Sequence, residues 1–282
     1  MSYNSYQPFN ANQMPPAVKV ILFTNIGLWL VSYLLYTKAN FDLSNHLALF
    51  NWGSVNFRPW QFITYGFMHS FLNNSGSIDF WHIMGNMFGV YFFGSHLERF
   101  WGTRRFVIFY FVCLLGAVII YWGYNMYSQS AMVSETKMTI DNITPFDFYN
   151  YISKHEEVKE SIGKENLDKF YTAWKQHPND TSFENEAKGY LNNILDSLTN
   201  GSRIVGASGA VFGILLAFAM LFPNTLITPL IGFPIKAKYF VLLYGIVEFY
   251  SVIANVPGDS VAHIAHLGGM LTAFVLVKLW HR

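Results

Sequence analysis

Long apolar stretches separated by shorter polar segments run along most of the chain, a pattern typical of proteins that cross a membrane several times. The first stretch, residues 17–36, is about 20 residues long, which matches the hydrocarbon thickness of a bilayer. Five more stretches follow, at residues 80–100, 106–127, 204–222, 239–254 and 261–280. The pattern therefore predicts an all-α, polytopic membrane helical bundle with six transmembrane helices.

The polar segments divide the chain into four parts. Residues 1–16 predict a mobile N-terminal tail, residues 17–126 hold spans 1–3, residues 127–202 form a polar insert, and residues 203–282 hold spans 4–6. Helical patterns inside the insert predict a small helical appendage outside the membrane. A further apolar stretch, residues 226–235, is short and contains Pro229 and Pro234, so we expect an interfacial loop and not a seventh span.

Composition supports this division. Only 12% of the residues are charged, against roughly 25% in soluble domains. The insert alone holds 19 of the 35 charged side chains, with 7 basic and 12 acidic. The formal net charge of +1 gives no support to nucleic-acid binding. The single cysteine, Cys113, lies in an apolar stretch and excludes an intramolecular disulfide.

Basic residues predict the orientation, because they collect on the cytoplasmic side of membrane proteins. The basic residues of the insert are left out of the count, because long translocated segments barely follow this rule. With the N-terminus inside, three of the remaining basic residues fall on the outer side: Lys38, Arg58 and Arg203. Eight fall on the inner side: Lys19, Arg99, Arg104, Arg105, Lys236, Lys238, Lys278 and Arg282. We therefore expect both termini in the cytoplasm and the insert outside.

Polar groups inside membrane spans are costly, so each is a candidate functional residue. Every one also has an ordinary structural explanation. Ser208 lies beside Gly209-x-x-x-Gly213, a helix-packing pattern, and His263 and His266 alone resemble a pair of metal ligands on one helical face. His82 and Asn86 are compatible with an interhelical hydrogen-bond pair. The full set of candidates is His82, Asn86, Ser208, Glu248, His263 and His266.

The depth of these polar residues in the membrane favours a catalytic role over separate structural roles. Spans 2, 4 and 6 run in the same direction, and His82, Asn86, Ser208 and His266 lie within roughly 10 Å of the outer ends of these spans. A serine nucleophile needs a base such as His266, and an oxyanion needs donors such as His82, the Asn86 amide and the Ser208 backbone N–H. Glycines beside Ser208, such as Gly206, allow a substrate backbone to approach. Glu248 lies in the middle of span 5, so we expect a Ser-His dyad without a carboxylate.

Four motifs in this order resemble the rhomboid family of intramembrane serine proteases, over about 200 residues of the chain. They are Thr64-Tyr65-Gly66-Phe67-Met68-His69; His82-x-x-x-Asn86 followed by Gly94, Glu98, Arg99 and Gly102; Gly206-Ala207-Ser208-Gly209; and Ala265-His266-Leu267-Gly268-Gly269. Each motif is short, and their order, spacing and shared depth make the set specific.

The resemblance implies an intramembrane serine endopeptidase that cleaves transmembrane protein substrates from within the bilayer. Ser208 would be the nucleophile, His266 the general base, and Asn86, His82 and the Ser208 amide the oxyanion hole. His69, His263 and Gly206 are possible accessory residues. The resemblance implies no cofactor and no metal, and we expect an integral protein of the inner (plasma) membrane of a bacterium.

Two departures from the family pattern and two other functions remain open. His263 precedes His266 by three residues and is a second possible base, and His69 precedes His82 by thirteen residues, more than the common spacing in the family. The alternative functions are a rhomboid-like pseudoprotease that binds membrane proteins and a transporter lined by histidines. Against the transporter, the sequence suggests no acidic ligand at the depth of the histidines.

Overall fold

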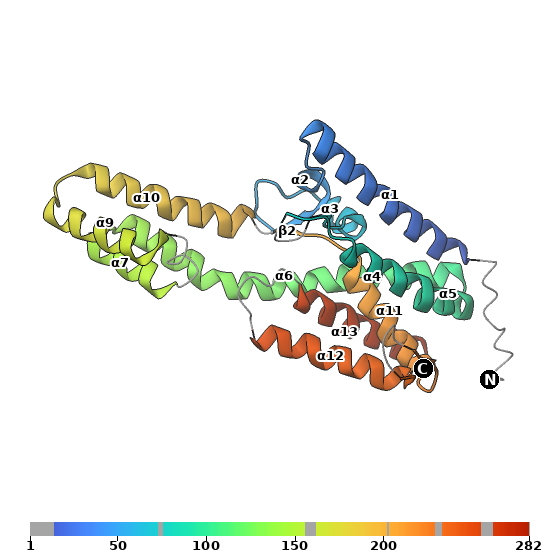
Figure 1. Cartoon of the computed structure of the whole chain (residues 1–282). Coiled ribbons are helices and arrows are strands. Elements are labelled where there is room, and N and C mark those ends of the chain that lie inside the picture. Colours follow the sequence, from blue (N-terminus) through green and yellow to red (C-terminus); the bar gives the residue numbers. More distant parts are fainter. Residues whose placement is uncertain are drawn as a thin grey trace.

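The computed structural model describes residues 14–72, 76–155, 162–201, 203–228, 233–254 and 262–281. Most of the predicted N-terminal tail lies outside these residues. Each of the six predicted spans coincides with helical structure (Figure 1). In chain order these are α1 (Pro16–Ala39), the pair α4 (Trp81–Gly89) and α5 (Ser95–Trp101), α6 (Thr103–Asp141), α11 (Ser208–Leu221), α12 (Ala237–Ala254) and α13 (His263–Trp280).

The six spans are not equally long. Within the described residues, four helices are long and apolar enough to cross a membrane by themselves: α1, α6, α12 and α13. The second span is continued through a π-helical segment, η2 (Val90–Gly94), which joins α4 to α5. The fourth, α11, has 14 residues. The predicted all-α polytopic bundle is confirmed, with a π-helical segment in its second span and a short fourth span.

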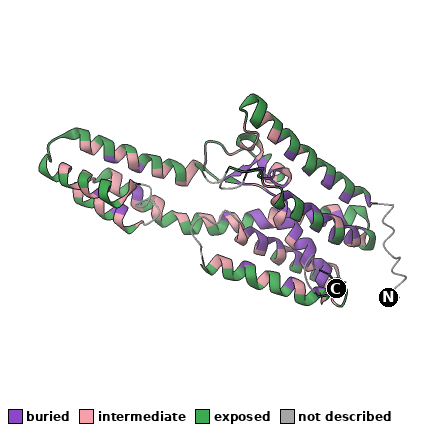
Figure 2. Cartoon of the chain, viewed as in Figure 1, coloured by how far each residue is buried: buried purple, intermediate pink, exposed green. Residues whose placement is uncertain are grey.

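The membrane helices bury one side and expose apolar side chains on the other (Figure 2). Val20 and Phe23 of α1 and Leu242 and Phe249 of α12 are all more than half exposed. In water such a surface would be unstable, but lipid tails cover it without cost. The burial pattern is that of a bundle whose outer face lies in a bilayer.

Contacts at glycines show the relative directions of the central helices. A Cβ on Gly209 of α11 would meet Ala265 of α13, and a Cβ on Gly213 would meet Gly269. The contacts advance together by four residues, so α11 and α13 run parallel. A Cβ on Gly116 of α6 would meet Thr272, and one on Gly268 would meet Ile120, so α6 runs antiparallel to α13.

The second span runs parallel to α11 as well. Phe93 packs edge-on against Phe218 at 5.0 Å, and Phe100 packs similarly against Phe222 at 5.4 Å. A Cβ on Gly89 would meet Val211, closer to the start of α11. The prediction that spans 2, 4 and 6 share one direction therefore agrees with the helix contacts.

A carboxylate fixes the start of α1 against the second span. Glu98 of α5 accepts hydrogen bonds from the backbone N–H groups of Ala17 and Val18, at 2.9 and 2.8 Å. These N–H groups have no partner within their own helix, and a carboxylate also interacts favourably with the helix N-terminus. Thr103 donates a further hydrogen bond to Glu98. The buried glutamate thereby ties three helices together.

The polar insert is a helical arm with a core of its own. The last part of α6 projects from the bundle and packs with α7 (Pro145–Lys154), α9 (Lys164–Gln176) and α10 (Thr181–Asp196) (Figure 1). A second cluster of buried apolar residues holds these helices: Phe148, Tyr151, Ile152, Leu167, Trp174, Ala187 and Leu191. Helix α6 continues without interruption from the bundle into the arm, so the two parts share one rigid element.

Short elements complete the chain. The segment between α1 and α4 contains α2 (Ser44–Leu47), β1 (Leu49–Phe50), α3 (Gln61–Thr64) and the 3-10 helix η1 (Tyr65–Phe67). After α10, the π-helical η3 (Ser197–Gly201) leads to β2 (Arg203–Ile204), which pairs antiparallel with β1. In the predicted interfacial loop, β3 (Leu226–Ile227) pairs with β4 (Ile235–Lys236), and Pro229 lies outside the described residues.

Candidate active site

Three candidate residues lie in the first turns of three helices. Ser208 is the first residue of α11, His82 is the second residue of α4, and His266 is the fourth residue of α13. Because these helices run parallel, their first turns lie at the same end of the bundle. The first N–H groups of a helix have no partner within it, so the Ser208 amide is available as a hydrogen-bond donor.

Close contact between α11 and α13 brings Ser208 and His266 to neighbouring positions. A Cβ on Gly269 would lie only 1.8 Å from the Gly209 carbonyl oxygen, so only glycine permits this approach. The His266 ring stacks on Phe212, one turn after Ser208, with ring centroids 4.2 Å apart and an interplanar angle of 13°. Among the described residues, no hydrogen bond joins the Ser208 hydroxyl to His266. Such bonds are often long without substrate.

Glu248 of α12 corrects the expectation that no carboxylate lies at the depth of the histidines. Its Oε2 accepts a hydrogen bond from His266 Nδ1 at 2.8 Å and another from His263 Nδ1 at 2.7 Å. A carboxylate can only accept, so both Nδ1 atoms carry the hydrogen. Glu248 and His266 are both 7% exposed. The expected dyad therefore has a third, buried partner.

The reason for this error lies in the end of the helix from which the depth of Glu248 is measured. Helix α12 runs to Ala254, so Glu248 is six residues, about 9 Å, from its end. The next helix returns antiparallel, and His263 and His266 lie in its first turn. A glutamate side chain spans the remaining separation. Counting residues from the start of span 5 places Glu248 in the middle, whereas counting from its end places it beside the histidines.

The loop before Ser208 brings it close to His82. Gly206 has φ +121°, a conformation that L side chains rarely adopt. A Cβ at this position would lie 3.2 Å from His82 Nε2 and 3.6 Å from Ser208 Oγ. The Gly206 N–H donates to the Tyr65 carbonyl at 2.9 Å, which holds the loop in place. Gly206 therefore keeps a space open between the two candidate catalytic side chains.

Asn86 is buried on the same helix as His82. Its Nδ2 donates to the His82 carbonyl at 3.0 Å, one turn earlier. An amide nitrogen carries two hydrogens, so one remains for another acceptor. The hydrogen bond holds the Asn86 side chain toward the start of α4, which is where His82 lies.

His69 lies in the loop before α4 and packs against His82, with ring centroids 5.2 Å apart in an edge-to-face arrangement. It is 2% exposed. Burial, with the nearby His82 as a second cause, lowers the pKa of His69 to about 3. A neutral, buried ring in this position supports the placement of His82, which in turn lies close to the loop before Ser208.

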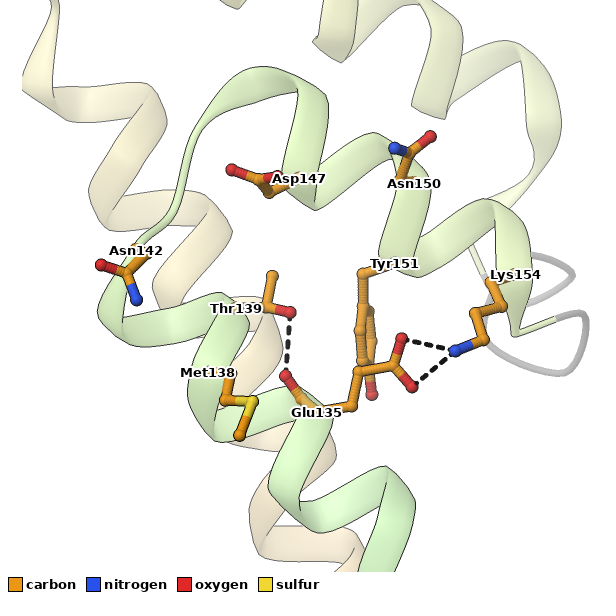
Figure 3. A pocket seen from close by; sticks show the side chains of 8 residues that line it. All are labelled: Glu135, Met138, Thr139, Asn142, Asp147, Asn150, Tyr151 and Lys154. Carbon is orange, nitrogen blue, oxygen red and sulfur yellow. Dashed lines mark hydrogen bonds and ion pairs between the residues drawn. The ribbon is translucent and has the colours of Figure 1, made fainter.

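A hollow lies in the arm, away from these residues (Figure 3). Its volume is about 340 Å³, and its lining includes Met138, Asp147 and Tyr151. Lys154 Nζ donates to both carboxylate oxygens of Glu135 across one side, at 2.8 and 2.9 Å. None of the candidate residues predicted from the sequence lines this hollow.

The sequence reasoning missed Phe212 as a neighbour of the candidate base and placed the candidate Glu248 away from it. Glu248 is recognisable as a rare intramembrane carboxylate, but its partner depends on the exact ends of two helices. Phe212 gives no signal at all, since a phenylalanine four residues after a serine is ordinary in an apolar helix. The helix-packing role of Gly209 and Gly213 is present alongside the candidate site.

The arrangement has the parts of an acyl-transfer site. It contains a hydroxyl at a helix start, an imidazole oriented by a carboxylate, and several nearby hydrogen-bond donors. The family model of the Rhomboid domain matches residues 56–137 and 158–282. No curated protein matches the chain. The matched residues include every motif of the bundle from the second span onward and cover well over half of the sequence, so the chain belongs to the rhomboid family.

Proposed function

We propose that the protein is an intramembrane serine endopeptidase that cleaves transmembrane segments of other proteins near the outer membrane face. The hydrogen bond between Glu248 Oε2 and His266 Nδ1 carries the proposal. With the hydrogen of His266 on Nδ1, the opposite ring nitrogen, Nε2, has a free lone pair. That nitrogen can take the proton of Ser208.

The reaction would proceed through an acyl-enzyme. Ser208 Oγ loses its proton to His266 Nε2 and attacks the scissile carbonyl carbon, whose oxygen becomes negatively charged. When the peptide C–N bond breaks, the imidazolium returns the proton to the leaving amine. Water then attacks the ester through the same base and releases the second product. Glu248 stabilises the imidazolium without becoming protonated.

The negative oxygen needs donors that are already oriented. We expect the Ser208 N–H, the second Asn86 amide hydrogen and the His82 ring to supply them. His82 Nε2 faces the space that the missing Cβ of Gly206 leaves open. This geometry supports the expected role of His82, with Gly206 as the residue that keeps the space free. The expected role of Asn86 is supported by its burial on the same helix, one turn after His82.

The substrate must lose helical hydrogen bonds before cleavage, because a transmembrane helix pairs its own amides. Glycine or proline near the cut would favour local unwinding. Ser208 is half-buried, and we expect water and an unwound segment to reach it from the end of the bundle.

The test compares the purified full chain with Ser208→Ala and His266→Ala. We expect a fluorophosphonate to label the wild type and not Ser208→Ala, and both variants to lose cleavage of a transmembrane test substrate. Ser32→Ala is the matched control, since Ser32 is also buried in a span but donates only to its own helix. Wild-type cleavage by both site variants would refute the proposal.

The pseudoprotease alternative predicts a different outcome of the same experiment. A membrane-protein binding factor would capture the substrate without cleaving it, and Ser208 would not react with the fluorophosphonate. The oriented His266 gives a reason to favour the protease, because a binding protein has no need of a carboxylate that fixes a tautomer.

The orientation of the chain is part of the proposal. We expect both termini in the cytoplasm and the arm outside, on the same side as the site. Cys113 is the only cysteine and is buried, so a single introduced cysteine can be labelled selectively. Ser182→Cys, in the arm, should react with an impermeant maleimide in intact cells. Labelling only after the cells are broken would show the opposite orientation, with the arm in the cytoplasm.

A further inference from the structure

Glu248, His263 and His266 present three metal-ligating atoms to one point. The two imidazole Nδ1 atoms approach the same carboxylate oxygen at 2.7 and 2.8 Å, and all three ligand atoms lie within 4.8 Å of one another. The two histidines are three residues apart on α13, so their side chains share a helix face. Helix α12 supplies the carboxylate from the opposite side.

This set matches the coordination chemistry of Zn²⁺. Zinc is bound by imidazole nitrogens and carboxylate oxygens at about 2.0–2.2 Å, often by three protein ligands and one exchangeable water. Three ligands at those distances lie closer together than the limit of 4.8 Å. Small side-chain movements of Glu248 away from the histidines would therefore admit the ion. The site favours a divalent transition metal over Mg²⁺ or Ca²⁺, which prefer all-oxygen ligands.

We propose that Glu248, His263 and His266 form a binding site for a divalent transition metal such as Zn²⁺, and that the bound ion inhibits the protease. The metal-binding half stands on the cluster alone. The inhibitory half rests on the proposed function, in which His266 is the general base. Both halves run against the expectation, drawn from the family resemblance, that the protein uses no metal.

Inhibition follows from the tautomer of His266. In the metal-free site Nδ1 carries the hydrogen and Nε2 is the base. A metal ion must bind the Nδ1 lone pair, so the hydrogen moves from Nδ1 to Nε2 and the ring remains neutral. Nε2 then has no lone pair with which to deprotonate Ser208. The ion also takes Glu248 away from its role as hydrogen-bond acceptor.

His263 gives the proposal a discriminating variant. It is a ligand in the cluster, whereas the proposed acyl transfer uses His266. His263→Gln removes one of the three ligands and leaves Glu248 and His266 in place. His281→Gln is the matched control, because it also removes one histidine but changes an exposed residue at the end of the chain.

Binding is measured first, with the full chain purified through a tag without histidine and treated with a chelator. Zn²⁺ is titrated by calorimetry into the wild type, His263→Gln, His281→Gln and Ser208→Ala. We expect one site whose affinity falls at least about tenfold in His263→Gln and is unchanged in the other two variants. Equal affinities in the wild type and His263→Gln would overturn the site and leave only adventitious binding.

Inhibition is measured second, as fluorophosphonate labelling and substrate cleavage over the same Zn²⁺ series. Each variant is compared with its own metal-free rate. We expect Zn²⁺ to inhibit the wild type and His281→Gln alike, and the half-inhibiting concentration to rise at least about tenfold in His263→Gln. Specific binding without inhibition, or equal inhibition of His263→Gln, would overturn the regulatory half.

The two experiments separate this proposal from the proposed function. If the metal-free wild type neither labels nor cleaves, the protease assignment fails, while the zinc titration of the wild type and of Ser208→Ala still decides whether the site exists. If metal-free activity is present and zinc does not bind the cluster, only the metal proposal fails.

Discussion

Glu248 and His266 are hydrogen-bonded at 2.8 Å across two antiparallel helices, eighteen positions apart in the chain. The pair is buried, and the same carboxylate oxygen also contacts His263. A buried carboxylate that holds one tautomer of a histidine is a positioning residue, because it acts on the reaction through the ring.

Glu248→Gln should therefore reduce the rate more than substrate binding. A glutamine can donate to Nδ1 as well as accept from it, so the ring no longer has one preferred tautomer. We expect kcat to fall about 10²–10⁴-fold with little change in KM. Steady-state kinetics on a transmembrane test substrate measure this split. Val247→Ala, on the exposed face of the same helix, is the control. Wild-type kcat in Glu248→Gln would contradict the positioning role.

Gly206→Ala should impair catalysis through the loop before Ser208. The residue has φ +121°, and a Cβ would lie 3.2 Å from His82 Nε2. The loop or the His82 ring must shift, and a displacement of about 1 Å costs up to about 100-fold in rate. Gly85→Ala is the matched control, since a Cβ there meets nothing within 4 Å. Equal kcat/KM values for the two variants would rule out a role of Gly206 in shaping the site.

Gly269→Ala should destabilise the bundle itself. The added Cβ would collide with the Gly209 carbonyl oxygen, so α11 and α13 would have to separate. Forcing a methyl group into a packed contact typically costs about 1–3 kcal/mol or more. Unfolding by denaturing detergent, followed by circular dichroism, should begin at a lower concentration. Gly27→Ala, where a Cβ meets nothing within 4 Å, should unfold like the wild type.

The arm should lose some stability in acid. Hydrogen bonding from Lys154, with a contribution from His155, lowers the pKa of Glu135, which lies on the part of α6 beyond the bundle. A carboxyl with a lowered pKa stabilises the fold fully above its pKa in the unfolded chain. The contribution disappears as the pH falls through the lowered value. Lys154 and Glu135 are 64% and 34% exposed, so the effect is below about 1 kcal/mol.

The difference between wild type and Glu135→Gln isolates this contribution. Urea unfolding of the arm can be followed by the fluorescence of buried Trp174, with Trp174→Phe as the blank. The two proteins should differ near neutral pH and converge in acid. Glu165→Gln makes the same charge change on an exposed helix position. A difference between Glu135→Gln and wild type that persists at low pH would exclude the ion pair as its source.

Much of the bundle can be predicted from the sequence, because membrane helices need long apolar stretches wherever they occur. Residues 17–36 and 261–280 predict α1 and α13 within a few residues. The π-helical segment η2 leaves no comparable pattern, since its residues are as apolar as those of an α-helical span. The stretch 106–127 likewise predicts the membrane part of α6 but not its continuation to Asp141, where polar residues follow on the same helix.

The sequence by itself determined the candidate residues: Ser208, His266, His82 and Asn86 are rare polar groups in apolar helices, where an unpaired polar group is costly. Tertiary structure alone decided their partners. Glu248 reaches His266 because α12 and α13 end and begin at particular residues, and Gly206 faces His82 because the loop has a positive φ. Both relationships depend on offsets of a few ångström between helices, which are set by packing of glycine against glycine. The periodicity of residues along a single helix does not predict such offsets.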